Sequence, residues 1–106
     1  MNGRHFVEVC HAEKEAILKE YFSDESETQV AFEIRELIAN GADKDKLFNL
    51  INLVMNESFY CLLTGLDGEC SLGGEQVTYK LYDEDDNLLN ECGEIEENAY
   101  SLFMED

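Results

Sequence analysis

The stretch EQVTYKLYDEDDNLLNECGE, residues 75–94, decides whether the chain folds as helices alone or as helices with a small sheet. Val77, Tyr79 and Leu81 occupy every second position, a period of two in residue types that favour strands. The acidic run DEDDN is typical of a turn, and the residues that follow it, to Cys92, are typical of a returning strand. The stretch therefore predicts a β-hairpin over residues 76–92.

The same stretch partly matches a twelve-residue calcium loop. Asp83, Asp85, Asn87 and Glu94 stand at positions 1, 3, 5 and 12, where such a loop places oxygen ligands. Position 6 of a calcium loop is glycine, however, and here it is Leu88. The loop also needs an entering helix, whereas the preceding pattern is that of a strand. We therefore expect no metal and no cofactor, and keep a calcium-responsive module as a third hypothesis.

Upstream of the hairpin, apolar residues recur at helical spacing along three segments, 4–22, 27–40 and 44–65. The apolar stripe of the first segment comprises Phe6, Val9, Cys10, Ile17 and Tyr21. The third segment is apolar around so much of its circumference that we expect it to be the central helix of a small bundle.

Local signals mark where these helices begin and end. Ser26 and Gln29 form a capping box at the start of the second helix, and Gly41 after Asn40 favours its end. Asp43 is the expected cap of the third helix. A last helix is expected over 94–104, because acidic residues fill its first turn, where the helix dipole favours anions.

The sequence thus predicts one acidic domain over residues 1–106, of the α+β class. A three-helix N-terminal bundle is followed by the β-hairpin and then by the C-terminal helix. Because a two-stranded hairpin is marginal alone, we expect it to pack on the helices or to gain a strand from another chain. The oligomeric state stays open.

Charge limits the possible functions. The 106 residues carry 25 Asp and Glu against seven Lys and Arg, a net charge of −18. Direct nucleic-acid binding is not expected, because phosphate contacts need Lys and Arg to displace counterions. A basic protein partner is favoured, since long-range attraction would speed its association. We expect no membrane span and no targeting signal, and hence a cytoplasmic protein.

Nothing in the sequence indicates an enzyme. His5 and His11 lie six residues apart, on different helical faces, and no nucleophile motif or phosphate-binding loop is present. The cysteines, at positions 10, 61, 70 and 92, are separated by 51, 9 and 22 residues, which matches no zinc template. We expect four reduced thiols and no catalytic residues.

The densest acidic cluster is the candidate site. It lies on the predicted hairpin tip and the helix start beside it, with a tyrosine expected to be exposed as an anchor. The expected partner-binding residues are Tyr82, Asp83, Glu84, Asp85, Asp86, Glu91, Glu94 and Glu97. Asp67, Glu69 and Glu75 either extend this surface or serve the end of the third helix.

Residues 59–100 resemble a small, acidic and largely uncharacterised family of bacterial proteins. The resemblance rests on the pattern LLxGLDGExSxGGxQxxYxLYDExGN followed by GEIExxAY. The chain departs from the pattern at two positions. Asp86 stands where the pattern has glycine, and Cys70 stands where alanine is expected.

Proteins of this size and charge are also similar to immunity proteins of bacterial polymorphic toxin systems, which bind and block a toxin domain. This likeness implies a non-enzymatic inhibitor of a basic toxin, such as a nuclease. The alternative is a structural or regulatory domain whose charge only keeps it soluble.

Overall fold

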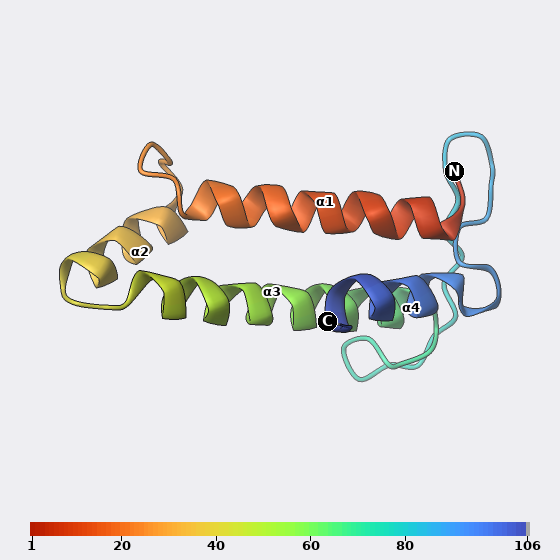
Figure 1. Ribbon diagram of the computed structural model, residues 1–106. Coiled ribbons are helices and arrows are strands. Elements are labelled where there is room, and N and C mark those ends of the chain that lie inside the picture. Colours follow the sequence, from red (N-terminus) through yellow and green to blue (C-terminus); the bar gives the residue numbers. More distant parts are fainter. Residues whose placement is uncertain (106) are drawn as a thin grey trace.

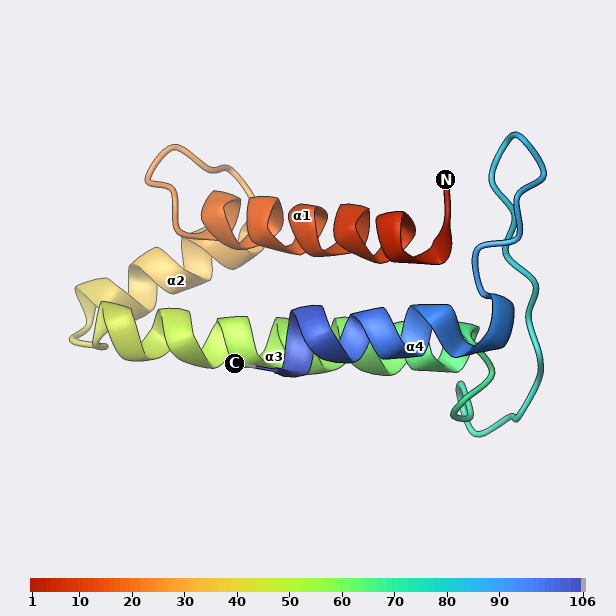
Figure 2. The same cartoon turned by 45° about the vertical axis from the view of Figure 1, so that its right-hand side comes forward.

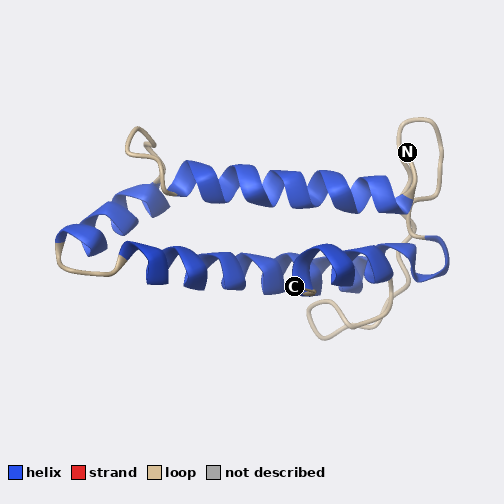
Figure 3. Ribbon diagram, in the orientation of Figure 1, coloured by secondary structure: helices blue, strands red, loops and turns tan. Residues whose placement is uncertain are grey.

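Helices make up the regular structure of the computed structural model, which describes residues 1–105 without the side chain of Cys92 (Figure 3). The elements are α1 (Gly3–Tyr21), α2 (Gln29–Ala39), α3 (Lys44–Leu66), a 3-10 turn η1 (Glu91–Gly93), α4 (Glu94–Ala99) and a π-helical turn η2 (Tyr100–Met104). Residues 1–105 contain no strand, so the predicted α+β class is wrong and the fold is helical.

The chain runs along α1, crosses at α2 and returns along α3, so that α1 and α3 are antiparallel (Figures 1 and 2). α4 then packs against both α1 and α3. Along α3 it covers only the C-terminal half (Figure 1). The predicted N-terminal bundle required α2 to pack as the third helix beside α1 and α3. At that end of the molecule the third helix is instead α4.

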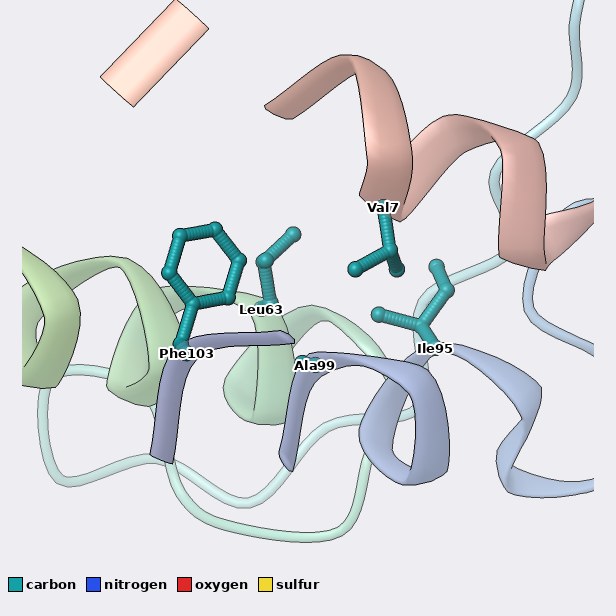
Figure 4. Packing of buried hydrophobic residues seen from close by; sticks show 5 residues of the cluster. All are labelled: Val7, Leu63, Ile95, Ala99 and Phe103. Carbon is teal, nitrogen blue, oxygen red and sulfur yellow. The ribbon is translucent and has the colours of Figure 1, made fainter. Parts of the chain in front are cut away.

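The central hydrophobic cluster lies between α1, α3 and the C-terminal helix. It consists of Val7, Leu63, Ile95, Ala99 and Phe103, which point toward one another (Figure 4). Ile95, Ala99 and Phe103 are four residues apart, so the π-helical turn keeps Phe103 on the face that α4 buries. Leu81, from the loop that precedes α4, packs against this cluster.

The helix caps follow local chemistry. Asn2 accepts a hydrogen bond from the amide of His5 at 2.8 Å, and Asp43 accepts one from Lys46 at 3.0 Å. The capping box predicted at Ser26 is wrong. Thr28 caps α2 by accepting from the amide of Ala31, while the buried Ser26 hydroxyl accepts from the amide of Thr28.

The predicted stripe of α1 is correct only in part. Phe6 and Cys10 pack against the central cluster, but the fully buried face is centred on Val7, Lys14 and Leu18. Val9 is 47% exposed, whereas Lys14 is only 2% exposed. The Lys14 ammonium donates to Asn52 Oδ1 at 2.9 Å and to Glu15 Oε1 at 3.2 Å. A long aliphatic stem with a paired charge thus occupies a position that the pattern reserves for an apolar residue.

The β-hairpin predicted over 76–92 does not form. Within this segment the chain turns back once, with a single isolated bridge between Tyr82 and Leu88. The side-chain amide of Asn90 accepts from the amide of Leu81 at 3.0 Å and donates to the carbonyl of Tyr79 at 2.7 Å. The Asn90 side chain thus occupies the amide of Leu81 and the carbonyl of Tyr79, which a second strand would otherwise pair. Strand pairing therefore does not continue past Leu81.

The molecule is elongated. Its radius of gyration is 16.2 Å and its extents are 47 × 29 × 25 Å, whereas a compact chain of this length would have a radius of about 13 Å. α3 is not the enclosed central helix that we expected. Leu50, Leu53 and Val54 are 58%, 56% and 54% exposed on its outer side.

Candidate partner-binding surface

Most of the acidic residues after α3 belong to one segment, 67–97, which we call the acidic segment. It holds eleven Asp and Glu and one basic residue, Lys80, for a net charge of −10. It leaves the C-terminal end of α3, forms the loops at the end of the molecule where the N-terminus lies, and finishes in α4 (Figures 1 and 2).

Six of the eight predicted contact residues are exposed: Tyr82, Glu84, Asp85, Asp86, Glu91 and Glu97. Tyr82 is 55% exposed, as expected of an anchor. The other two, Asp83 and Glu94, are partly buried. The structure thus places an exposed aromatic ring directly beside three exposed carboxylates in one turn.

Asp83 holds that turn together from inside. Its carboxylate accepts hydrogen bonds from the amides of Asp85 and Asn87, both at 2.9 Å, and from the Asn87 side-chain amide at 3.0 Å. It also lies 3.1 Å from the Met1 amino group. The bonds from Asn87 are the main cause of an Asp83 pKa well below its usual range. Asp83 is therefore a structural residue.

Asp86 completes the turn with an unusual backbone conformation. Its φ is +63°, in the left-handed region that glycine favours and that Asp tolerates better than most residues. Its amide donates to the carbonyl of Asp83 at 3.1 Å. Asp86 thus combines a glycine-like backbone conformation with an exposed carboxylate.

Asn90 and Asp67 attach the acidic segment to the helices, and only Asp67 had an expected role there. Asn90, besides its bonds within the segment, donates to the carbonyl of Leu66 at the end of α3. Asp67 follows α3 and accepts from the amide of Glu96 at 2.8 Å, which links the end of α3 to the start of α4. No periodicity or motif indicates the role of Asn90, because its partners are 9 to 24 residues away.

Asp67 is 8% exposed, so it belongs to the interior and not to a contact surface. Its second oxygen, Oδ1, has no hydrogen-bond partner among the described residues. Burial raises the pKa of this carboxyl, against the lowering effect of the Glu96 amide, and the carboxylates of Glu69, Glu96 and Glu94 raise it further. Asp67 was expected either to extend the contact surface or to serve the end of the third helix. The geometry supports the role at the end of α3.

Glu94 faces α1, where its carboxylate accepts from the amide of Arg4 at 3.3 Å. Gly3 allows this approach, because a Cβ there would overlap the carbonyl of Leu89 and press on the Glu94 side chain. The acidic segment is thereby held against the first turn of α1.

The four oxygen ligands of the calcium hypothesis do not converge. Asp83 accepts from three N–H groups within its own turn, and Glu94 is directed to Arg4. Within residues 1–105, no three His, Cys, Asp or Glu side chains form a group able to hold a metal ion. Cys10, Cys61 and Cys70 are free thiols, and the expectation for Cys92 lies outside the described side chains.

A hollow of about 260 Å³ lies at the opposite end of the molecule, between the end of α1, α2 and the start of α3. Arg35 and Lys44 are the basic residues of its lining. The Arg35 guanidinium donates to the carbonyls of Ser23 at 3.0 Å and Ser26 at 2.9 Å, so it holds the connection between α1 and α2. The geometry indicates a structural role for this arginine.

We expect Asp83→Ala to loosen the turn. The amides of Asp85 and Asn87 would lose their acceptor and exchange about three to ten times faster, while the helices keep their protection. Because the pKa of Asp83 is lowered on folding, its stabilising effect is present above about pH 3.9 and is lost as the pH falls through the lowered value. Amide hydrogen exchange followed by NMR measures both effects.

Asp85→Ala is the matched control, since it removes the same charge two residues away from an exposed side chain. It should leave the exchange of the Asn87 amide nearly unchanged. Equal acceleration in the two variants would contradict the structural role of Asp83.

Compared with protein-family models, with curated proteins and with solved structures, the chain shows no match. Among residues 1–105, no helix combines the length and the apolar character needed to cross a membrane.

Proposed function

We propose that this protein is a non-enzymatic binding protein, an immunity-type inhibitor that neutralises a basic bacterial toxin, such as a nuclease, in the cytoplasm. The observation that carries the proposal is the acidic turn at residues 82–86. It exposes Tyr82 and three carboxylates on a backbone fixed by Asp83 and by the left-handed Asp86. The size and acidic charge of the chain, which are similar to those of immunity proteins, favour the same function.

A fixed turn suits recognition, because ordering a flexible loop on binding lowers affinity. Here the hydrogen bonds to Asp83 and Asn90 order the loop before any partner arrives. The exposed carboxylates would occupy the cationic groove of the toxin in place of nucleic-acid phosphates. Tyr82 would supply the aromatic contact that often carries much of the binding energy.

The distribution of charge favours rapid association. The acidic segment carries −10, whereas residues 1–66 carry twelve acidic and six basic residues, a net of −6. The field is therefore strongest at one end of an elongated molecule. Such a field attracts and orients a basic protein, and its effect falls with ionic strength.

The second candidate is a structural or regulatory domain whose charge serves solubility. Exposed carboxylates along α1 and α2, such as Glu13, Glu20 and Glu36, favour it, because they are not gathered into the acidic segment. The two candidates differ in one respect that can be measured. Binding requires carboxylates at particular positions, whereas solubility depends on their number.

The proposal predicts that a toxin domain is encoded immediately upstream of the gene of this protein, and the product of that neighbouring gene is the probe. We expect a complex whose affinity falls at least tenfold between about 50 and 300 mM salt, and again about tenfold in Asp85→Lys or Glu97→Lys. Isothermal titration calorimetry measures the affinity, and stopped-flow fluorescence measures the association rate. A salt-insensitive complex, or none, would sink the proposal.

A matched pair of triple variants separates position from total charge. Glu84→Gln/Asp85→Asn/Asp86→Asn and Glu13→Gln/Glu20→Gln/Glu36→Gln remove equal charge from exposed sites. The first should weaken the complex and the second should leave it nearly intact. Equal weakening would favour a role of net charge alone.

A further inference from the structure

The outer side of α3 carries exposed apolar side chains, Leu50, Leu53 and Val54, that no other element within residues 1–105 covers. Lys46, Leu50, Leu53 and Glu57 follow one another at spacings of four, three and four residues, and all four are exposed. Val54 and Cys61, also exposed, lie beside this line. The spacing is that of a coiled-coil seam, in which successive positions face a second helix. α4 lies along the C-terminal half of α3 and leaves its N-terminal half, where Lys46, Leu50 and Leu53 lie, uncovered (Figures 1 and 2).

Electrostatics favour a second copy as the occupant. The 23 residues of α3 carry Lys44, Asp45, Lys46 and Glu57 as their only charges, a net of zero in a chain of −18. Elsewhere two copies would meet with strongly like charges, which oppose association. α3 also has more exposed large apolar side chains than any other helix of residues 1–105. Hydrophobic attraction between two copies is therefore strongest where the charge repulsion between them is weakest.

We propose that two copies pair through α3 in antiparallel orientation, with the two-fold axis between Ile51 and Asn52. In this register Leu50 of each copy meets Leu53 of the other. The same register places Lys46 of each copy beside Glu57 of the other, so both ends of the seam carry opposite charges. A parallel pair would instead place Lys46 against Lys46 and Glu57 against Glu57.

The antiparallel arrangement also separates the acidic segments. α3 is about 34 Å long at 1.5 Å per residue, and the acidic segment begins at its C-terminal end. The two acidic segments would thus lie at opposite ends of the pair, beyond the Debye length of about 8 Å at physiological salt. Each remains accessible, so pairing is independent of the proposed inhibitor function.

Sedimentation velocity of the full chain from about 1 to 300 μM tests the proposal. We expect a monomer–dimer equilibrium with a dissociation constant in the micromolar range, as for a small interface. Leu53→Glu should weaken it about a hundredfold, because it places a carboxylate against Leu50 of the second copy. Leu53 is more than half exposed in the single chain, so circular dichroism of the variant should keep its helical spectrum.

A charge exchange tests the register. Lys46→Glu and Glu57→Lys should each weaken the dimer about tenfold by creating like-charged pairs, and the double variant should restore it. Glu57→Lys is the sharper of the two, since it makes the chain less acidic and yet should reduce pairing. Cys61 reports on orientation, because in the proposed register the two Cys61 residues are about 28 Å apart along the seam.

Several outcomes would overturn the proposal: a monomer at every concentration, a dimer unaffected by Leu53→Glu, or no recovery in the double variant. Ready oxidation to a Cys61–Cys61 disulfide between copies would show a parallel pair and would also overturn it. A chain that stays monomeric, but loses the basic partner in Leu53→Glu, would assign this face to that partner instead.

Discussion

Replacing Phe103 by alanine is expected to lower the free energy of unfolding by about 3 to 5 kcal/mol. The ring is 4% exposed and packs edge-on against His11 at 5.2 Å and tilted against Phe59 at 5.6 Å. It therefore joins the C-terminal turn to both α1 and α3. Since small domains are stable by only about 5 to 15 kcal/mol, the variant should be partly unfolded at 37 °C. Urea denaturation followed by circular dichroism measures the loss.

Phe32→Ala is the control with the same change of side chain. Phe32 is 50% exposed on α2, and the Arg35 guanidinium lies 4.8 Å from its ring centroid. Its loss should cost no more than about 1 kcal/mol, the range of an exposed cation–π contact. Similar costs at the two positions would contradict a core placed between α1, α3 and α4.

The helices were predictable because their signals are local. A cap such as Asp43, or a glycine such as Gly41 with φ at +103°, acts within one turn of the helix that it bounds. Helical periodicity likewise needs no knowledge of distant contacts to indicate a helix. It does not indicate which face is buried, and the prediction for α1 failed on that point at Val9 and Lys14.

The hairpin was predicted wrongly because a strand depends on its neighbour. Val77, Tyr79 and Leu81 have the residue types and the spacing of a strand, but β propensity largely reports the fit to a paired surface. Here the Asn90 side chain accepts from the amide of Leu81 and donates to the carbonyls of Tyr79 and Leu66. Such a competition between one side chain and a ladder is not visible in a pattern of hydrophobicity.

The candidate site was predictable in part. Runs of acidic residues in a turn are usually exposed, and six of the eight predicted side chains are exposed. Asp83 differs because it accepts from the amide of Asn87 within its own turn. Glu94 differs because it accepts from the amide of Arg4, which only the three-dimensional arrangement brings near. Asp67 is buried for the same reason, since its partner, Glu96, is 29 residues away.

Lys14→Ala is expected to lower the free energy of unfolding by about 2 to 4 kcal/mol, although lysines are usually surface residues. The side chain is 2% exposed between α1 and α3, so alanine would leave a cavity where the four-carbon stem packs. Lys14→Met, which keeps much of the length and no charge, should stay within about 1 kcal/mol of the natural protein or exceed it. Chemical denaturation of the two variants compares packing with charge.

Lys19→Ala on the exposed side of the same helix is the control and should change the stability by less than about 0.5 kcal/mol. If Lys14→Met were as damaging as Lys14→Ala, the ammonium bonds to Asn52 and Glu15 would be the main contribution of the residue, and packing of the stem a minor one. We expect the opposite order, because burying a charge has a desolvation cost that a partly exposed partner such as Glu15 offsets only in part.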